Sequence, residues 1–367
     1  SIADPFLPKK IEEGRIEDIR ECIGCNICVT GDMTMSISRC TQNPTFMEEW
    51  RKGWHPERMN IKGDSSNVLV IGTGPAGLEA ARAVAERGYD VALAEAGTIL
   101  GGRVARERHL PGLSAWGRVA DYREYQLSQK ANVESYFDSE LDAESILEFG
   151  FENVCIATGA KWRRDGVSRQ HVVPFPTDVA MPLFTPDDLM NGASPTGHVV
   201  IYDDDHYYMG GVLAELLIQK GCRVTLVTPA AYVSEWTLNT LEQHEIHRRL
   251  ATMGVEIELN RGVTAINKDY VETNCMFTDI TRPLECDGVL LVSSRVENNV
   301  VYNDLKLREA EWRDAGIKSV KLIGDANAPG PIAWATYAGH RYARELDGND
   351  IGDALPFRRE ITQLEVD

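Results

Sequence analysis

Four cysteines near the start of the chain, Cys22, Cys25, Cys28 and Cys40, are spaced C-x2-C-x2-C-x11-C. Three thiolates on one tight loop and a fourth on the next segment can bind the separate irons of a cubane cluster. Structural zinc sites more often use two well-separated CxxC pairs. An isolated CxxC redox pair would leave two of the cysteines unexplained. The spacing favours an iron–sulfur cluster, with zinc as the alternative.

A glycine-rich turn follows the cysteines. Gly72, Gly74 and Gly77 form a GxGxxG motif between an apolar run and a helical pattern, and Glu95 ends the next apolar run. In a dinucleotide site, the first glycine permits the turn, the second admits a pyrophosphate and the third allows close helix–strand packing. The helix N-terminus offers free N–H groups to the phosphates. Glu95 would bind ribose hydroxyls and disfavour a 2′-phosphate.

Other candidate nucleotide contacts lie at or beyond neighbouring strand ends. A second glycine pair follows the acidic strand end, and Thr158-Gly159 and Gly324-Asp325 close two later strands. In this order they are typical of flavoprotein disulfide-reductase-type domains, in which the aspartate lies near the pyrophosphate or the ribitol. The further candidate residues are Pro75, Ala76, Ala96, Gly102, Arg103 and Asp325.

The elements that position these residues read as an α/β fold. Hydrophobic runs predict a β-turn-α-β unit from residue 67 to 96, and a second such unit begins at 198. Two Rossmann-like nucleotide-binding domains are therefore expected after a loop-rich cluster segment. The expected boundaries are 1–60 for the cluster segment, 61–195 plus 310–367 for the ADP/FAD-type domain, and 196–309 for an inserted, degenerate NAD(P)-like domain.

The second unit lacks its phosphate motif. After the apolar run 198–202, where GxGxxG or GxGxxA is expected, the chain reads DDDHYYMGG, beginning at Asp203. Carboxylates at this turn repel phosphate, and tyrosines obstruct the approach of a pyrophosphate to the backbone. A cation site on Asp203, Asp204 and Asp205 is a minor alternative. The sequence thus predicts a domain retained for packing, without hydride transfer from a nicotinamide.

Composition limits the partners. The net charge is −18 and 43% of residues are hydrophobic, so neither nucleic acid nor a membrane is expected as a partner. No apolar run approaches the length of a transmembrane helix, and a cytoplasmic location is expected. The remaining cysteines are read as small core side chains, with no disulfide framework. They are Cys155, Cys222, Cys275 and Cys286.

These motifs together resemble the C-terminal half of the iron–sulfur flavoproteins that include trimethylamine, dimethylamine and histamine dehydrogenases. Bacterial 2,4-dienoyl-CoA and enoate reductases are more distant relatives. The matching stretches cover most of the chain; they are CIGCNIC, CTQNPT, GWHPER, VIGTGPAGLEAA, LPGLSAWG, YREYQ, IATGA and LIGDANAPGPIAWATYAGHRYAREL.

The resemblance implies a [4Fe-4S] cluster on the four cysteines that takes electrons from FMN in an N-terminal TIM barrel. That barrel is absent from this chain, which begins without Met and reads as part of a longer polypeptide. The Gly72–Gly77 site would hold ADP in the amine dehydrogenases and FAD in the reductases. A homodimer and an electron-transferring flavoprotein as acceptor are also implied. Arg118 stands where a tyrosine assists that docking in some relatives.

Two features favour the amine dehydrogenase branch. Cys25 and Cys28 are separated by two residues as in those enzymes, and the Asp203 turn argues against a nicotinamide site. The 11-residue gap between Cys28 and Cys40 is one residue shorter than expected for trimethylamine dehydrogenase, and the chain ends sooner after its last predicted helix than the methylamine enzymes do. Both features favour a histamine-type enzyme. The expected function is the electron-transfer and ADP-binding part of an enzyme that deaminates a primary or methylated amine. The alternative is an NAD(P)H-dependent 2,4-dienoyl-CoA or enoate reductase that uses FAD, FMN and [4Fe-4S].

Overall fold

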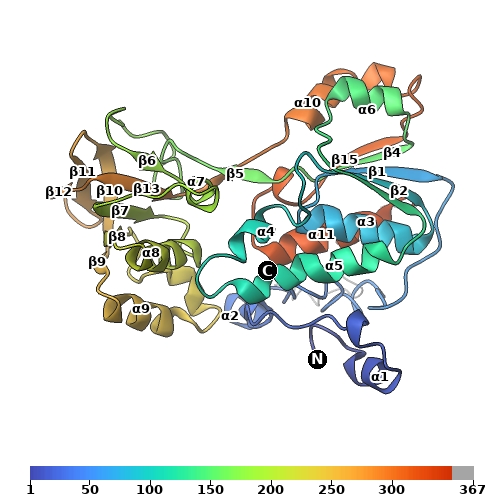
Figure 1. The fold of residues 1–367 in the computed structure, drawn as a ribbon, viewed down its shortest axis with the longest axis horizontal. Coiled ribbons are helices and arrows are strands. Elements are labelled where there is room, and N and C mark those ends of the chain that lie inside the picture. The colour runs from blue at the N-terminus through green and yellow to red at the C-terminus, as the bar shows by residue number, and fades with distance from the viewer. Residues whose placement is uncertain (349–367) are drawn as a thin grey trace, which may run out of the picture.

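The computed structural model describes residues 1–348. The chain forms two α/β lobes that stand side by side, with the N-terminal segment beneath them (Figure 1). The first lobe is built on a five-stranded parallel sheet. Its strand order is β15 (Ser319–Leu322), β4 (Asn153–Ile156), β1 (Asn67–Ile71), β2 (Asp90–Ala94) and β3 (Val133–Tyr136).

Helices cover both faces of this first sheet because its strands are apolar on both sides. Val68 and Val70 of β1 pack with α3 and α11, whereas Leu69 and Ile71 pack toward α6 and α10. Figure 1 shows α3, α5 and α11 below the sheet and α6 and α10 above it. The helices are α3 (Pro75–Arg87), α5 (Arg118–Ser128), α11 (Ile332–Glu345), α6 (Ala143–Phe149) and α10 (Val300–Leu307).

The second lobe repeats this plan. Its five-stranded parallel sheet has the order β6 (Leu183–Phe184), β13 (Gly288–Val292), β7 (His198–Asp203), β8 (Arg223–Val227) and β9 (Glu256–Glu258). Val199 and Ile201 pack with α8 (Met209–Gln219), and α9 (Gln243–Thr252) lies beside α8. Val200 and Tyr202 instead pack against an antiparallel sheet, consisting of β10 (Arg261–Ile266), β11 (Tyr270–Cys275) and β12 (Thr281–Glu285).

The two lobes are joined by a two-stranded antiparallel ribbon. β5 (Ala160–Trp162) leads the chain out of the first lobe and β14 (Arg295–Glu297) pairs with it on the way back. The second lobe is therefore inserted within the first, because β15 and α11 return to the first sheet and its helices. The ribbon lies directly beside the strand ends that carry the candidate site residues.

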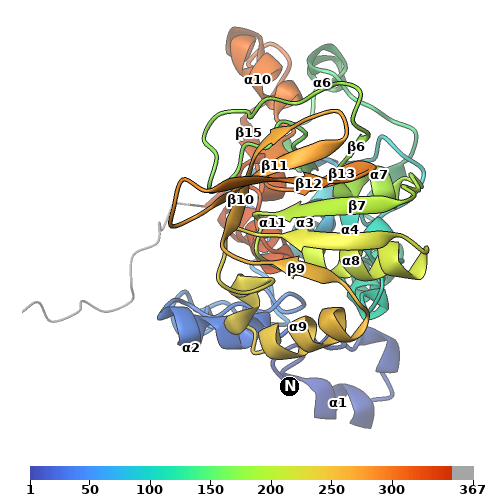
Figure 2. The ribbon, with the colours of Figure 1, turned by 90° about the vertical axis from the view of Figure 1, so that its left-hand side faces the viewer.

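Residues 1–60 contain little regular structure. Short helices α1 (Leu7–Glu12) and α2 (Thr30–Thr34) and single turns η1 (Ile16–Asp18) and η2 (Ile27–Val29) are connected by loops. Figures 1 and 2 show this segment running beneath both lobes. The Asn26 side chain donates to the Thr240 carbonyl oxygen of the second lobe at 3.0 Å. The segment thus reaches both lobes at their junction.

The predicted α/β fold with Rossmann-like parallel sheets is confirmed, and the predicted strands are present at their expected places. The domain boundaries stay predictions. Residues 349–367, which the prediction assigns to the ADP/FAD-type domain, lie outside the described residues. Cys155, Cys222 and Cys286 are buried as expected, but Cys275 is not: it ends β11, where the hairpin leaves its thiol partly exposed. In residues 1–348 no helix has the length and apolarity to cross a membrane.

The remaining short elements connect these parts. They are α4 (Arg103–Glu107), η3 (Ser114–Gly117), α7 (Pro186–Met190), η4 (Glu235–Leu238), η5 (Glu309–Glu311) and η6 (Gly324–Ala326).

Candidate functional site

The four N-terminal cysteines lie on the loops around η2. Cys22 is exposed, and Cys25, Cys28 and Cys40 are partly buried. Burial raises the pKa of the Cys25 thiol to about 11, and nearby Cys40 and Cys28 add to the rise. The pKa of Cys40 is also raised, by burial first and then by Cys28 and Cys22. Thiols that raise one another's pKa lie within electrostatic reach, so the loop brings the four together.

These thiols carry the surroundings that a cluster ligand needs. The Gly24 N–H donates to Cys22 Sγ and the Asn43 N–H to Cys40 Sγ, both at 3.4 Å, and Thr41 Oγ1 lies 3.2 Å from Cys25 Sγ. Hydrogen bonds to sulfur set the reduction potential of an iron–sulfur cluster. Cys22 and Cys40 thus accept backbone N–H groups and Cys25 lies beside a hydroxyl. These surroundings fit the predicted [4Fe-4S] group, which would supply one-electron transfer when bound.

A site for a single metal ion needs its ligands arranged differently from those of a cluster. Among residues 1–348, no group of three or more His, Cys, Asp or Glu side chains is arranged to hold one metal ion. A zinc site places four sulfurs about 4 Å apart around one ion. A cubane instead binds each thiolate at a different iron, so its four sulfurs lie farther apart, around the whole cluster, than the sulfurs around a single zinc ion.

The cluster segment is clamped to the nucleotide-binding lobe by buried charges. Arg123 of α5 is fully buried and donates to Gln42 Oε1 at 3.1 Å and to Glu79 Oε2 of α3 at 2.8 Å. His340 Nδ1 of α11 lies 2.9 Å from the other Glu79 oxygen. Despite burial, Arg82, Arg123 and His340 hold the pKa of Glu79 well below its usual value. Sequence reasoning missed this clamp because its residues lie in stretches far apart in the chain, which meet only when the cluster segment, α3, α5 and α11 pack together.

The turn between β1 and α3 has the geometry of a phosphate cradle. Gly72 has φ +97°, and a Cβ there would lie 2.5 Å from the Ala157 carbonyl oxygen. A Cβ at Gly77 would lie 1.9 Å from the Gly72 oxygen, whereas one at Gly74 would meet nothing within 4 Å. No side chain caps α3 and Pro75 has no N–H, so the backbone N–H groups of Ala76 and Gly77 at the start of the helix are available to a ligand. Gly74 is thus the side of the turn open to phosphate.

Glu95 stands at the end of β2, beside this turn. Its Oε2 accepts from the Thr73 N–H at 3.1 Å and from the Thr73 hydroxyl, and its Oε1 accepts from Gly97 N–H at 2.9 Å. The carboxylate is half-buried and fixed next to the cradle, and Ala96 after it is exposed. This placement suits a carboxylate that receives hydrogen bonds from a ribose.

Gly102 and the residue after it border the cradle on a second side. Gly102 has φ +54°, and a Cβ there would come within 2.9 Å of Gly74 Cα, so only glycine permits this approach. Arg103 pairs with Glu107 at 2.9 Å and with Asp325 at 3.4 Å. Asp325 Oδ1 also accepts from the Gly330 N–H at 3.0 Å. The predicted residues Gly102, Arg103 and Asp325 are therefore brought together at one end of the cradle.

A second arginine reaches Asp325 from the ribbon between the lobes. Arg295 of β14 forms an ion pair with Asp325 and donates to the Gly330 carbonyl oxygen at 2.9 Å. Its guanidinium lies 5.5 Å from the Trp162 ring of the paired strand. No sequence signal marked Arg295, because only the antiparallel pairing of β5 and β14 brings it to this strand end.

The corresponding turn of the second lobe is closed. Asp203 ends β7 and is fully buried. A Cβ built on Gly210, at the start of α8, would lie 2.5 Å from the Asp203 Oδ2 atom. Burial, and next the Asp205 carboxylate, raises the pKa of Asp203 to about 7. Asp204 is equally buried and is paired with His206 at 3.0 Å. A side-chain carboxylate thus occupies the helix end where a nicotinamide cofactor places its phosphates.

A cavity of about 290 Å³ lies between the cluster segment and the two lobes. It is lined by Cys25 and Thr41 from the cluster segment, Arg103 and Arg295 from the Asp325 group, and Tyr207 from the closed turn. Its other walls are mainly aromatic and apolar. No sequence motif predicted this cavity, since its walls come from many short stretches spread along the chain from residue 23 to residue 334.

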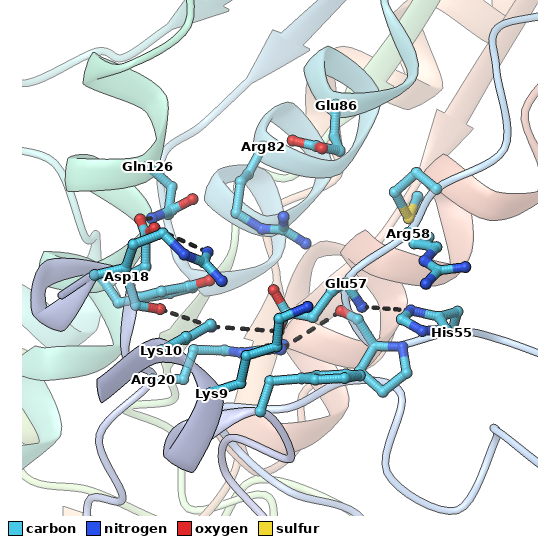
Figure 3. A pocket seen from close by; sticks show the side chains of 15 residues that line it. Lys9, Lys10, Asp18, Arg20, His55, Glu57, Arg58, Arg82, Glu86 and Gln126 are labelled. Carbon is cyan, nitrogen blue, oxygen red and sulfur yellow. Dashed lines mark hydrogen bonds and ion pairs between the residues drawn. The ribbon is translucent and has the colours of Figure 1, made fainter. Parts of the chain in front are cut away.

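A second cavity, of about 310 Å³, lies between residues 6–20 and 55–59 of the cluster segment and the helices α3 and α5 (Figure 3). It is rich in basic side chains, but most of them are paired with carboxylates. Lys10 pairs with Asp4 at 2.8 Å and with Glu57 at 3.3 Å, and Arg20 also pairs with Glu57. This cavity has no contact with the cysteines or the cradle and is not assigned to the site.

Arg118, named from the resemblance as the residue at an acceptor-docking position, lies beside the cluster loop. Its Nη1 donates to the Cys22 carbonyl oxygen at 3.4 Å, and its Nε pairs with Glu21 at 2.8 Å. The side chain is half-exposed. The surface next to Cys22 is therefore charged, and the docking of a protein acceptor there stays a prediction.

Comparisons with known proteins agree with this geometry. Residues 66–179 match the family described as pyridine nucleotide-disulphide oxidoreductase, and residues 184–301 match the OYE-like second alpha/beta domain. Dimethylamine dehydrogenase from Hyphomicrobium sp. (strain x) is 38% identical, with 98% of this chain and 52% of that protein aligned.

Two solved structures are closely similar over the whole fold. Histamine dehydrogenase from Rhizobium sp. 4-9 is 70% identical with a TM-score of 0.96, covering 100% of this chain and 54% of that one. The 6-hydroxypseudooxynicotine amine oxidase from Pseudomonas geniculata N1 is 44% identical with a TM-score of 0.90, covering 94% and 51%. The chain spans about half the length of each of these relatives, and it belongs to the family of the dimethylamine and histamine dehydrogenases.

Proposed function

We propose that this chain is the C-terminal electron-transfer and ADP-binding part of an iron–sulfur flavoprotein amine dehydrogenase. The observation that carries the proposal is the combination of an open cradle at Gly74 with a closed second turn at Asp203. A protein with these two turns can hold a nucleotide but does not receive hydride from a nicotinamide. Its electrons then come from another donor, which we propose to be an amine oxidised at FMN outside this chain.

The four cysteines would hold a [4Fe-4S] cluster that supplies one-electron transfer between that flavin and an external acceptor, such as an electron-transferring flavoprotein. The chain's own residues provide the surroundings. N–H groups of Gly24 and Asn43 and the Thr41 hydroxyl would stabilise the ligand sulfurs. The Arg123 clamp fixes the segment that carries Cys40 against the nucleotide helix. The substrate is a primary or methylated amine, with histamine the first to test because of the relative with 70% identity.

The nucleotide itself has a structural role in this proposal. Backbone N–H groups of the Gly72–Gly77 turn bind the pyrophosphate, and Glu95 holds the ribose of ADP. The test is extraction of the nucleotide from the denatured holoprotein and its identification by mass spectrometry. Recovery of ADP with oxidation of histamine supports the proposal. FAD in its place, with no amine oxidised, would contradict it.

A second candidate is an NAD(P)H-dependent enoate or dienoyl reductase with FAD at this cradle. The observation in its favour is the cavity beside Arg103, which has room for a ring next to the cluster segment. The Asp203 carboxylate opposes it. Anaerobic titration with NADPH separates the two: bleaching of flavin absorbance would support the reductase, and an unchanged spectrum supports the dehydrogenase.

A further inference from the structure

The cavity of about 290 Å³ next to Cys25 is not explained by the nucleotide cradle. Its size suits a ring system of small-molecule dimensions. It lies where the cluster segment, the first lobe and the closed turn of the second lobe meet. A molecule bound there would touch both the cluster segment and the aromatic residues that replaced the nicotinamide motif.

The wall of the cavity is built for a flat ring. Tyr207 and Tyr208 of the closed turn lie 4.7 Å apart, Trp236 lies 4.7 Å from Tyr207, and Trp116 lies 4.6 Å from Tyr208, as distances between ring centres. Edge and face contacts of this kind favour another aromatic partner. The six rings that line the cavity are Trp116, Trp162, Tyr207, Tyr208, Trp236 and Trp334.

Two polar groups that can donate hydrogen bonds border the same space. Trp162 is 6% exposed, and its indole N–H has no hydrogen-bond partner among the described residues. A buried N–H without a partner is unfavourable, and a ligand oxygen would satisfy it. The Arg169 guanidinium is exposed and lines the cavity together with the Asp205 carboxylate. Burial raises the pKa of Asp205, and the charges of Arg295 and then Arg169 oppose that rise. The site therefore offers two donors to oxygen atoms of a planar ligand.

The position of Cys25 indicates what such a ligand does. Cys25 lines the cavity, and it also packs with Trp116 against a small apolar cluster at Ile23. A ring in the cavity would lie next to a cluster ligand with no polypeptide layer between them. Trp334 is 42% exposed and Arg169 is exposed, so the cavity is open to solvent at one side. Small molecules and protons can enter there.

We propose that this cavity binds a flat, conjugated ring with two carbonyl oxygens, of the quinone class, which accepts electrons from the cluster. The proposal rests on the proposed function, because it needs the four cysteines to hold [4Fe-4S]. Two electrons, delivered singly as the cluster iron is oxidised, and two protons from solvent convert the quinone to a hydroquinone. The carbonyl oxygens become hydroxyls, and no other bond is broken.

The same chemistry could come from the isoalloxazine ring of FAD anchored at the Gly72–Gly77 cradle. Nucleotide extraction separates these sources. If ADP is recovered, no flavin ring is attached at the cradle, and the cavity is available to a free acceptor, as proposed. FAD recovered from the holoprotein would mean that a covalently attached ring belongs there, and this would overturn the proposal of a free quinone.

The experiment uses the holoprotein, with its cluster reduced anaerobically by one equivalent of dithionite and then mixed with menadione in a stopped-flow instrument. The expected result is cluster reoxidation at a rate that saturates with menadione concentration. Menadione should also quench tryptophan fluorescence with a similar half-saturation. A rate that rises linearly without saturation, and no quenching, would contradict a binding site.

Variants locate the site. The double variant Trp334→Ala, Arg169→Gln should raise the half-saturating menadione concentration about tenfold, since one aromatic contact and one hydrogen bond are lost. The control double variant Phe277→Ala, Arg313→Gln changes an exposed ring and an arginine outside the cavity. It should leave the half-saturating menadione concentration unaltered. Equal behaviour of the two double variants would overturn the proposal.

Filling the cavity is an independent test. A Cβ at Gly330 would meet only the Trp334 side chain, at 3.7 Å, so Gly330→Leu can be accommodated and should abolish saturable reoxidation and fluorescence quenching together. Because dithionite reduces the cluster in these experiments, they are independent of the amine. A protein that passes them but is not reduced by amines would refute the proposed function and leave the acceptor site standing.

Discussion

The carboxylate of Asp203 lies at the start of helix α8, so close to Gly210 that a Cβ there would be 2.5 Å from Oδ2. In the first lobe the equivalent helix, α3, has no capping side chain and begins at the open Gly74. Two lobes of the same plan therefore differ at the turn where we propose that the first lobe binds a nucleotide. This difference is the basis for assigning a nucleotide to the first lobe and none to the second.

Asp203 should make the stability of the protein depend on pH. Its pKa is raised to about 7 by burial, and next by Asp205, from a usual value of 3.8. Between these pH values the folded protein holds a proton on Asp203 that the unfolded chain has lost, so the contribution of Asp203 to stability is greatest below about pH 4 and falls as the pH rises to about 7. The Asp203→Asn variant does not ionise at this position, so it does not lose this stability as the pH rises. The gain in melting temperature of the variant over the parent should therefore be larger at pH 8 than at pH 5.

The control for this experiment is Asp90→Asn, at an exposed position. Its difference in melting temperature from the parent should not vary with pH over the same range. A gain for Asp203→Asn that is the same at pH 5 and pH 8 would show that the Asp203 carboxylate is already charged in the folded protein.

The three glycines of the cradle should separate binding from folding. Gly74→Ala adds a methyl group that meets nothing within 4 Å in the protein, so it should fold normally but lose about tenfold or more in ADP affinity through contact with the phosphate. Gly77→Ala places a Cβ 1.9 Å from the Gly72 oxygen and should destabilise the fold by more than about 2 kcal/mol. Calorimetry with ADP and thermal unfolding measure the two effects. Unchanged ADP affinity in Gly74→Ala would refute the assigned cradle.

Glu95→Gln tests the ribose contact. The carboxylate is held by Thr73 and Gly97 and would accept hydrogen bonds from ribose hydroxyls. Loss of a charged hydrogen bond costs about 1.5–3 kcal/mol, so ADP affinity should fall roughly ten- to a hundredfold. Discrimination against a nucleotide with a 2′-phosphate should weaken in the same variant, because the repelling charge is gone. Thr98→Ala, on the exposed loop beyond Gly97, is the control.

The cysteines give a direct test of the metal. Cys28→Ser should remove most of the iron and acid-labile sulfide from the purified protein, while Cys155→Ser, at a buried strand position in the first lobe, should retain both. Metal analysis of the parent protein also separates the alternatives left open by the spacing. Zinc without sulfide would identify a zinc site and refute the cluster.

Arg123→Met tests the clamp between the cluster segment and α3. It leaves the buried Glu79 with one fewer partner and frees the Gln42 side chain, which should cost about 3–5 kcal/mol of stability. The iron lost per protein on mild warming should rise in this variant. Arg308→Met, which breaks a surface pair with Glu311, should cost less than about 1 kcal/mol and leave iron content unchanged.

The parts of the fold and site that lie close together in sequence were predictable. The β1–α3 turn, Glu95 and the four cysteines could be recognised because their spacing is set by local backbone geometry. Arg295, Arg123 and Gln42 could not, since their partners lie far along the chain and are reached only when strands and helices pack. The cavity wall was missed for the same reason: Tyr207 was read as an obstacle at a turn, and its edge-to-face contact with Trp236 depends on how η4 folds over that turn.

The most direct test of the account is the source of the electrons. Holoprotein is mixed anaerobically with histamine, or separately with NADPH, frozen, and examined by electron paramagnetic resonance at low temperature. The account predicts the signal of a reduced [4Fe-4S] cluster with histamine and none with NADPH. Reduction of the cluster by NADPH without reduction by an amine would contradict it, because electrons would then enter through the second lobe that Asp203 closes.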